Sequence, residues 1–471
     1  MTFASGGPGD ASSVAASGAA DGVPPVRDHT GGVNDGRGSG ADAKLVRALG
    51  VRALAATMFN VMVGAGIFLL PAVAAGMLGP AAPLAYIACA VAIALIVLCF
   101  AEAGSRVSLT GGVYAYVEIA FGRWAGFVTG VLLWMVMTAA TAAVATAFAG
   151  QVVVALDAAG TAWGGVLRGV TLVVLLTLLA ATNVRGIRAG AHLVELATVV
   201  KLIPLVGFSV VGAYFIHPAA LSMSPLPHAS GVAAAAAVVI FAFGGIESAL
   251  VPSGEVRDPA RTIPRALFIA MAGVTLLYIA LQVVAQGILG ARLAAETDAP
   301  LAAAAGLALG GWARVVLLVG AAVSMFGHQS GMMLAAPRAL FAMGRDGVLP
   351  RTLAAVHPRF RTPHVAIVVQ AMVVLVLAIT GSFAPLATLA NAALLVLYLV
   401  CCAAAWELRR RDVRMGGIPF RVPGGALIPV AAIAVTIWLL AGMPARNLVA
   451  VGAVVVAAGV VGWIRERGRV K

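Results

Sequence analysis

The sequence predicts an all-α membrane protein with twelve transmembrane helices, and three observations carry this prediction. Of the 471 residues, 62% are hydrophobic and 10% are charged, whereas soluble domains carry about 25% charged residues. A mean hydropathy of +1.03 leaves too little polar surface to coat a water-soluble globule of this size. Twelve apolar runs are each long enough to cross the roughly 30 Å of bilayer hydrocarbon as a helix. These properties exclude a soluble enzyme, a secreted disulfide scaffold and a disordered regulator.

The apolar runs follow one another with short polar gaps. The sequence has no strands of alternating polarity, so helices are the remaining way to span a membrane. We expect residues 1–45, rich in Gly, Ala, Ser and Asp, to form a disordered cytoplasmic tail. Residues 46–410 are expected to form a core of ten spans, and 411–471 two more spans and a cytoplasmic C-terminus. The expected spans are 49–78, 82–105, 124–150, 166–183, 191–216, 230–251, 264–289, 312–342, 364–380, 384–405, 426–442 and 445–463.

The distribution of lysine and arginine predicts the orientation of these spans. The formal net charge is +13, but the basic residues lie in the gaps between apolar runs, as in cytoplasmic loops and unlike a nucleic-acid-binding patch. With both termini inside, 26 of the 31 basic residues face the cytoplasm. Arg168, Arg292, Arg314 and Arg446 remain outside, and Lys201 falls within a span. The sequence therefore predicts a multi-pass protein of the inner (cytoplasmic) membrane.

No metal or cofactor site is predicted. The four cysteines, Cys89, Cys99, Cys401 and Cys402, all lie inside apolar runs. They show no CxxC or Cys/His ligand spacing, so we expect neither disulfides nor structural zinc.

Two apolar runs carry a glycine pair near their middle. Gly64 and Gly66 lie in the first run, and Gly244 and Gly245 lie in the sixth. Glycine weakens a helix interior by about 0.5–1 kcal/mol relative to alanine, so each pair favours an unwound segment. The two breaks occupy equivalent places if spans 1–5 and 6–10 are inverted repeats, which is typical of the central site of a transporter. The alternative is that the glycines only allow close helix packing.

Unwinding leaves peptide groups without partners inside their own helix. Free N–H groups at the start of the outer half of span 1 favour an anion, and free C=O groups before each break favour a cation. An α-amino acid carries a carboxylate and an ammonium group close together, so it suits such a pair of breaks.

The chain resembles the amino acid–polyamine–organocation (APC) transporter superfamily over roughly residues 45–465. Within it, the chain is similar to bacterial arginine/agmatine-type antiporters and to related sodium-independent permeases. The resemblance rests on the break at Gly64-Ala65-Gly66-Ile67-Phe68, the break from Phe241 to Glu247, and the stretches Gly111–Tyr116, Glu255–Pro264 and Arg338–Pro350. It implies a LeuT-like core of five plus five inverted repeats, two additional C-terminal helices and transport by alternating access.

The resemblance also implies where a substrate binds. The carboxylate contacts fall on backbone N–H groups near Ala65 and Gly66, and the ammonium contacts on carbonyl groups near Met62, Phe241 and Gly244. Phe241 matches the aromatic gate above the substrate, and Phe243 competes with it for that role. The neighbouring Gly64, Ile67 and Ala242 complete the expected binding stretch.

The expected side-chain pocket contains no acidic residue that would pair with a cationic substrate. Its candidate lining is Thr138 and Thr141 on span 3, with Ser324 and Met332 on span 8. Met332 stands where arginine/agmatine antiporters place an aromatic ring against the guanidinium group, and methionine is a flexible apolar filler. This departure favours a neutral or hydrophobic amino acid over a cationic one, which remains the alternative.

Lys201 lies about eleven residues into span 5, roughly 16 Å along a helix and near the membrane centre. A lysine at this depth is costly, so a compensating site should surround it. In the sodium-independent branch that the chain resembles, a lysine at this point takes the place of the cation. We expect its ammonium to bond carbonyl groups at the span 1 break, with Gly64 as the candidate acceptor. The alternative is a lysine that points into a wet vestibule.

Glu247 directly follows the span 6 break and matches a proton-responsive glutamate of the arginine/agmatine antiporters. The hypothesis is that it changes protonation during transport, and the alternative is a structural hydrogen-bonding role. His328 is expected to serve packing or gating rather than proton relay. Glu195 is expected to lie near Arg185 and Arg188 at the inner interface. Glu102 and Glu118 are expected to pair with Arg106 and Arg123 in inner loops. Trp134 is expected to pack between helices or to lie in an interfacial belt.

The sequence thus predicts a secondary amino acid transporter, with a small-molecule substrate and lipid as partners and no nucleic acid. Proton symport, exchange and uniport stay open, as do monomer and homodimer. A carrier of the major-facilitator type would show two parallel six-span halves, which the two breaks oppose. A membrane-embedded enzyme would need a motif such as GxSxG or HExxH, or paired intramembrane aspartates, and the sequence contains none of them.

Overall fold

The structure is a computed structural model that describes most of the chain after the N-terminal tail. The described residues are 49–109, 111–156, 158, 160–185, 190–223, 226–251, 253, 256–345, 349–415 and 417–469, without the side chains of 190–199 and 463–469. The expected tail at 1–45, Arg188 and Glu255 therefore lie outside the description, as does the side chain of Glu195.

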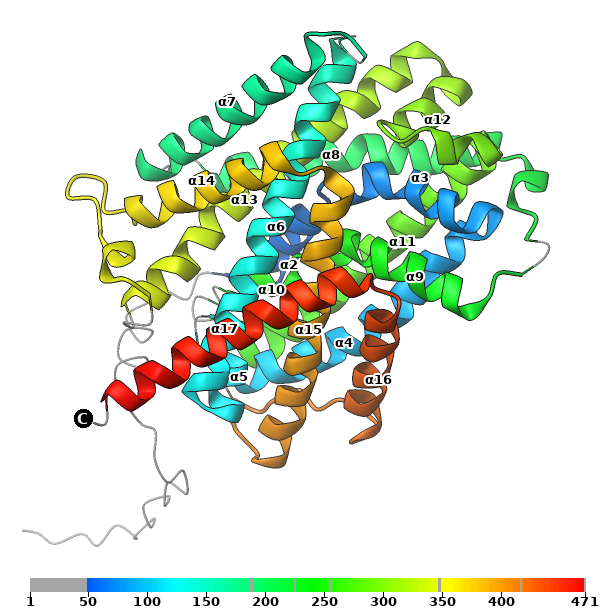
Figure 1. The fold of residues 1–471 in the computed structure, drawn as a ribbon. Coiled ribbons are helices and arrows are strands. Elements are labelled where there is room, and N and C mark those ends of the chain that lie inside the picture. The colour runs from blue at the N-terminus through cyan, green and yellow to red at the C-terminus, as the bar shows by residue number, and fades with distance from the viewer. Residues whose placement is uncertain are drawn as a thin grey trace, which may run out of the picture.

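The described residues form a bundle of helices. Among them, one isolated β-bridge pairs Leu49 with Val256. Figure 1 shows the long helices crossing at different angles around α6, with α16 and α17 at the periphery. The first half contains α2 (Val51–Met62), α3 (Gly66–Leu78), η1 (Gly79–Ala81), α4 (Ala82–Arg106), α5 (Val113–Phe121), α6 (Arg123–Ala155), α7 (Gly164–Arg185), α8 (Gly190–Gly212), η2 (Ala213–Phe215) and η3 (Pro218–Leu221). The second half contains α9 (Ala229–Val239), η4 (Ile240–Phe243), α10 (Ile246–Ala249), α11 (Pro259–Leu289), η6 (Gly290–Ala295), α12 (Pro300–Leu309), α13 (Gly311–Arg345), η7 (Arg351–Ala354), α14 (His364–Thr380), α15 (Phe383–Arg410), α16 (Leu427–Ala441) and α17 (Ala445–Arg469).

Every expected span coincides with helix in the structure. Eight helical stretches of the described chain are long and apolar enough to cross a bilayer, and five more apolar helices are shorter. The protein is therefore a multi-pass membrane protein, and the count of twelve crossings stays a prediction. Two short helices, α5 and α12, lie between expected spans and were not anticipated from the sequence.

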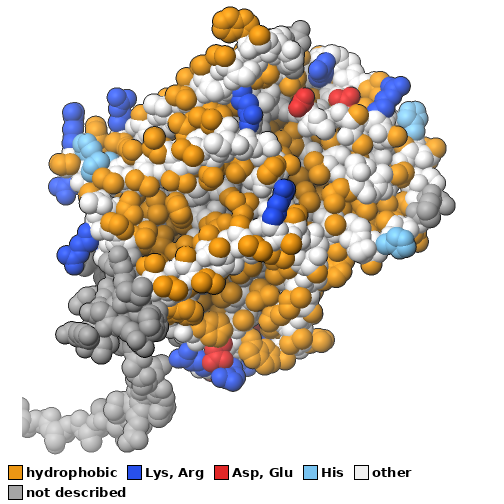
Figure 2. Space-filling view, viewed as in Figure 1, with side chains coloured by type: hydrophobic (Ala, Val, Ile, Leu, Met, Phe, Trp, Pro, Cys, Tyr) orange, Lys and Arg blue, Asp and Glu red, His pale blue; other side chains and the backbone are white. Residues whose placement is uncertain are grey.

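The outer surface of the bundle is apolar, as lipid contact requires. On α7, Val166, Val170, Val173, Val174 and Leu178 are all exposed, and their spacing places them on one side of the helix. Figure 2 shows hydrophobic side chains spread over the visible face, with most lysine and arginine side chains near its edges. A water-soluble monomer rarely exposes so continuous an apolar surface.

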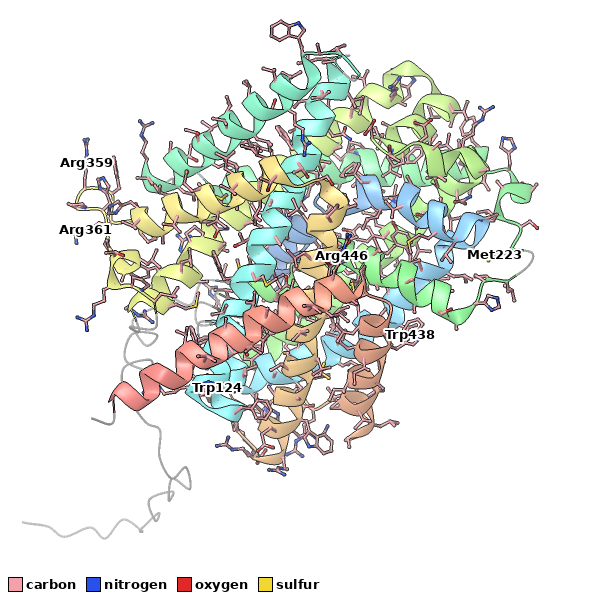
Figure 3. All side chains as sticks on the ribbon, viewed as in Figure 1. Trp124, Met223, Arg359, Arg361, Trp438 and Arg446 are labelled. Carbon is pink, nitrogen blue, oxygen red and sulfur yellow. The ribbon has the colours of Figure 1, made fainter. Side chains whose placement is uncertain are left out.

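Residues from an expected inner loop and an expected outer loop lie at opposite sides of the bundle, and which side faces the cytoplasm stays a prediction. Figure 3 shows Arg359 and Arg361, expected to be cytoplasmic, at the side of the molecule toward which the C-terminal end of α17 points. Met223 lies in an expected outer loop and is at the opposite side. Trp124 lies beside α17 and its Nε1 donates a hydrogen bond to the carbonyl of Gly459 at 3.0 Å.

A buried ion pair fastens the end of α4 to the segment between α15 and α16. Arg106 Nη2 lies 2.8 Å from Glu102 Oε1, and both side chains are about 1% exposed. Glu102 Oε2 also accepts the backbone N–H of Val422 at 3.2 Å, and Arg106 Nη1 donates to the carbonyl of Val413 at 3.2 Å. The expected pairing of these two residues is present, but it is buried beneath the connecting segment rather than exposed in a loop.

An exposed acidic group sits beside this pair. Hydrogen bonding from Arg414 lowers the pKa of the Asp412 carboxyl group. Asp412 Oδ1 also lies 3.6 Å from Arg106 Nη1, so it adds a second negative charge near the buried guanidinium. Because the pKa of Asp412 is lowered in the folded protein, its contribution to stability is present at neutral pH and is lost as the pH falls through that pKa.

The Glu102→Gln substitution is expected to lower the stability of the protein by about 3–5 kcal/mol, because it removes the buried counter-charge of the Arg106 guanidinium and leaves only the exposed Asp412 nearby among the described residues. The melting temperature of the purified protein in detergent measures this effect. Glu407→Gln is the matched control, since Glu407 pairs with the exposed Arg410 and exposed pairs contribute about 0–1 kcal/mol. Equal melting temperatures for the two variants would show that the buried pair does not hold the segment in place.

Candidate functional site

Both expected helix breaks are present. Helix α2 ends at Met62 and α3 begins at Gly66, so Val63, Gly64 and Ala65 lie outside regular helix. In the sixth span, α9 ends at Val239, the 3-10 segment η4 follows, and α10 begins only at Ile246. The backbone of the two spans is therefore interrupted at corresponding places.

Two glycines allow the two breaks to touch each other. A Cβ atom on Gly66 would lie 2.8 Å from the Cα atom of Ala242, and one on Gly245 would lie 2.7 Å from Cγ1 of Val61. Gly245 also has a φ of +121°, a backbone conformation that residues with a side chain rarely adopt. Unwinding and close packing, posed as alternatives from the sequence, thus occur together at this site.

Lys201 donates hydrogen bonds to carbonyl groups at the end of α2. Its side chain is fully buried, and Nζ donates to the Asn60 carbonyl at 2.7 Å, to Asn60 Oδ1 at 2.9 Å and to the Val63 carbonyl at 2.9 Å. All three protons of the ammonium therefore have acceptors. The expected contact with this break is present, and the reading as a lysine in a wet vestibule is wrong.

The acceptors of Lys201 differ from the one expected. The carbonyl groups of Asn60, in the last turn of α2, and of Val63, directly after it, both reach the same ammonium. The chain leaves the helical conformation at Val63, with ψ of 76°, and Gly64 follows that turn. Gly64 was the wrong candidate because Asn60, in the last turn of α2, and Val63, the first residue of the break, present their carbonyl groups to Lys201.

The remaining carbonyl groups at the end of α2 are held by other helices. Tyr278 donates its hydroxyl to the Met62 carbonyl at 2.9 Å, and Ser324 donates to the Val63 carbonyl at 2.5 Å. His328 Nδ1 lies 2.6 Å from the Val61 carbonyl. The Met62 carbonyl also accepts the N–H of Gly64 at 2.8 Å. Met62 was expected to bind the substrate ammonium, but its carbonyl already accepts two hydrogen bonds.

The backbone N–H groups at the start of α3, unlike the carbonyl groups at the end of α2, lack hydrogen-bond partners within the described part of the chain. Among the hydrogen bonds of the described residues, the N–H groups of Ala65, Gly66 and Ile67 have no acceptor, whereas those of Phe68 and Leu69 bond to the Ala65 carbonyl. Free N–H groups and the helix dipole make such an end attractive to an anion. This is the place where the sequence predicts the substrate carboxylate.

A small cavity lies against both breaks. It has about 20 Å³ of space for the centres of water molecules, enough for about one water, so a larger ligand requires its walls to spread. It is lined by Met62, Gly64, Ala65, Gly66, Val136, Ala140, Val144, Phe241, Gly244, Gly245, Glu247, His328, Met332, Ala390, Asn391 and Leu394. Of the predicted residues, Ile67, Thr138, Thr141, Ala242, Phe243, Lys201 and Ser324 do not line it.

The prediction for α6 placed the wrong face of that helix toward the cavity. Thr138 Oγ1 bonds to the Trp134 carbonyl at 2.7 Å, and Thr141 Oγ1 to the Met137 carbonyl at 2.5 Å. Hydroxyl groups that bond back to their own helix in this way are satisfied without a ligand. The cavity wall is formed instead by Val136, Ala140 and Val144, which are spaced four apart on one face.

The structure separates the two candidate aromatic gates. Phe241 lines the cavity and packs edge-on against Phe383, with ring centroids 5.5 Å apart. Phe243 is completely buried and packs against Tyr278 at 5.3 Å. Of the two phenylalanines, Phe241 is therefore the one that lies beside the cavity. Its gating role stays a prediction.

Glu247 is buried at the cavity wall. Its carboxylate accepts the N–H of Gly245 at 2.9 and 3.1 Å, and the hydroxyl of Tyr398 at 3.1 Å. The structural hydrogen bonds weighed from the sequence are thus present, and the proposed change in protonation remains a hypothesis. Trp134, by contrast, belongs to packing between helices, since its Nε1 donates to Gln370 Oε1 at 2.7 Å.

The sequence analysis missed several residues that line the cavity. Ala390, Asn391 and Leu394 come from α15, where Leu394 lies four and three residues after the other two and is therefore next to both on the helix surface. Asn391 is an intramembrane polar residue, and a search for such residues beyond the charged types would have found it.

A multi-pass helical bundle with two touching broken helices and a central cavity defines a membrane transport protein. The chain belongs to the amino acid permease family, which matches residues 49–464, within the APC superfamily. It is 33% identical to an uncharacterized transporter of Mycobacterium tuberculosis over 89% of this chain and 91% of the relative. It is 27% identical to the methylthioribose transporter of Bacillus subtilis, over 85% and 89% of the two chains. It is 26% identical to the branched-chain amino acid permease of Bacillus subtilis, over 85% and 88%.

The Gly66→Ala substitution is expected to destabilise the protein by about 1–3 kcal/mol, because the added methyl group meets the backbone of Ala242 and overpacks the contact. The control is Gly207→Ala in α8, where the added Cβ has no atom within 4 Å and alanine favours the helix. Melting temperatures of the two purified variants measure the difference. If Gly66→Ala melts as late as Gly207→Ala, the two breaks do not depend on this close approach.

Proposed function

We propose that the protein is a sodium-independent permease that moves neutral amino acids across the cytoplasmic membrane by alternating access, with proton symport or exchange as its coupling. The observation that carries the proposal is the contrast between the two helix ends at the first break. The carbonyl groups at the end of α2 are bonded to protein side chains, whereas the N–H groups at the start of α3 are free beside the cavity. A substrate carboxylate supplies the missing acceptors.

The ammonium group of the substrate then binds to carbonyl groups at the second break. The Gly244 carbonyl accepts no hydrogen bond among those of the described residues, and Gly244 lines the cavity together with Ala65 and Gly66. The Phe241 carbonyl accepts one bond, from the N–H of Gly244 at 3.3 Å, and keeps a second lone pair. A zwitterion spanning from one break to the other uses both sets of groups.

The packing of the helices supports a core of two repeated halves of five spans. Equivalent helices of the two halves pack on each other: α4 on α11, α6 on α13 and α7 on α14. Other contacts come in equivalent pairs, such as α6 with α15 and α13 with α8, or α2 with α11 and α9 with α4. The unanticipated short helices also correspond, since α5 packs on α15 and α12 on α8. Inverted repeats moving relative to each other are the basis of alternating access.

The position of Lys201 supports sodium independence. Its ammonium group already uses the carbonyl groups of Asn60 and Val63, and Ser324 donates to the same Val63 carbonyl. A sodium ion needs such oxygen atoms as ligands, so a fixed positive charge on them removes both the need and the room for the ion.

The cavity wall supports a neutral substrate. Glu247 is its one acidic residue among the described residues, and that carboxylate already accepts bonds from Gly245 and Tyr398. The remaining wall is apolar apart from His328 and Asn391. The name of the branched-chain amino acid permease, a relative, points in the same direction.

Purified protein in liposomes is expected to take up neutral amino acids at the same rate when potassium replaces sodium in the buffer, because Lys201 stands in for the cation. Uptake of labelled amino acids over time, with and without sodium, measures this. Arginine, agmatine and methylthioribose serve as competitors. Uptake that scales with sodium contradicts the role of Lys201, and competition by arginine or agmatine alone contradicts a neutral substrate.

The Glu247→Gln substitution is expected to flatten the dependence of uptake on pH, because glutamine keeps the shape of the side chain and cannot exchange a proton. Initial uptake rates between pH 5 and pH 8 measure the profile. Glu407→Gln, on the exposed end of α15, is the control and should keep the wild-type profile. An unchanged profile in Glu247→Gln would leave only the structural role of this residue.

A further inference from the structure

Two buried polar atoms at the cavity wall have no hydrogen-bond partner. They are Nε2 of His328 and Oδ1 of Asn391. Both residues line the cavity, and their exposed fractions are 5% and 0%. The other unpartnered buried side-chain atoms of the described chain belong to residues outside the lining. Buried polar atoms nearly always have partners, so this pair points to a ligand.

The contact of His328 with α2 decides what its second nitrogen offers. Nδ1 lies 2.6 Å from the Val61 carbonyl oxygen. A carbonyl oxygen only accepts hydrogen bonds, so Nδ1 carries the proton. In the neutral imidazole, Nε2 is then a hydrogen-bond acceptor.

The amide of Asn391 is fixed by the same reasoning. Its Nδ2 lies 3.0 Å from the carbonyl oxygens of both Ala237 and Val238 on α9. Two carbonyl acceptors require the NH₂ group on that side, which leaves Oδ1 on the other side. Oδ1 is therefore a second acceptor at the cavity, on a different helix from the first.

We propose that His328 Nε2 and Asn391 Oδ1 form an acceptor pair that selects substrates with a hydrogen-bond donor on a short side chain, as in threonine and serine. The inference rests on the proposed function, since it names the substrate class of the same site. Backbone N–H and C=O groups hold the ends of the zwitterion, so the acceptor pair remains for the side chain. The walls at Gly64, Ala140 and Ala390 are formed by small residues around a small cavity, which favours a short side chain over a long amide.

The selectivity follows from the cost of leaving these acceptors empty. Valine has nearly the shape of threonine but carries a methyl group in place of the hydroxyl. Bound valine would seal both acceptors away from water without a donor, and sites built for a hydroxyl reject such analogues strongly. One hydroxyl donates one hydrogen bond at a time, so we expect about a tenfold preference for threonine over valine.

Competition against labelled threonine uptake in liposomes tests the proposal. Unlabelled threonine is expected to compete at about tenfold lower concentration than valine, and serine better than alanine. In the double variant His328→Asn with Asn391→Leu both acceptors are gone, so the ratio of valine to threonine inhibition constants is expected to fall toward one. In His328→Gln with Asn391→Leu an amide oxygen reaches the place of Nε2, so part of the preference should return. His217→Asn, at an exposed histidine outside the cavity, is the matched control.

The outcomes separate this inference from the proposed function. Valine competing as well as threonine in the wild-type protein overturns the acceptor pair, and that comparison needs no variant. A preference that survives in the double variant, which lacks both acceptors, overturns the role of the acceptor pair. If no neutral amino acid is taken up or competes at all, the proposed function itself fails. Size-exclusion profiles of the variants establish that a changed ratio comes from folded protein.

Discussion

The end of a helix in the middle of a membrane has no water to satisfy its carbonyl groups, and this constraint organises the centre of the protein. The last carbonyl groups of α2 are bonded by Lys201 from α8, Tyr278 from α11, and Ser324 and His328 from α13. Each bond removes a desolvation cost that the broken helix would otherwise carry. Three helices are thereby tied to one short stretch of backbone, so a shift of α2 must move or break all of these contacts together.

The hydrogen-bonding groups on the two sides of the first break have different partners, and the proposed function depends on this difference. Protein side chains saturate the carbonyl side, including the fixed charge of Lys201. The N–H side, at Ala65, Gly66 and Ile67, keeps its hydrogen-bonding capacity. A site with unmet donors binds an anionic group at little cost of reorganisation. The same division appears in the cavity wall, where Glu247 is engaged by Gly245 and Tyr398 while His328 and Asn391 each keep one unpartnered atom.

Much of this arrangement was predictable, because the signals are local in the chain. Apolar run length predicted where the helices lie, and the glycine pairs predicted both breaks. The depth of Lys201 predicted a compensating site, since an ammonium group in hydrocarbon needs acceptors. The residues from Met62 to Gly66 and at Phe241, Gly244 and Glu247 line the cavity or border it as the motifs indicate.

What the sequence by itself determined is the helical character of the chain, the positions of its breaks and the family to which it belongs, because each depends on residues close together in the chain. Tertiary structure alone decided which face of each helix meets the cavity. The rotation of α6 and α15 about their axes is set by packing against distant helices. That rotation turns Thr138 and Thr141 toward their own backbone and brings Val136, Ala140 and Asn391 to the wall. The same non-local packing made Asn60 and Val63, rather than Gly64, the partners of Lys201.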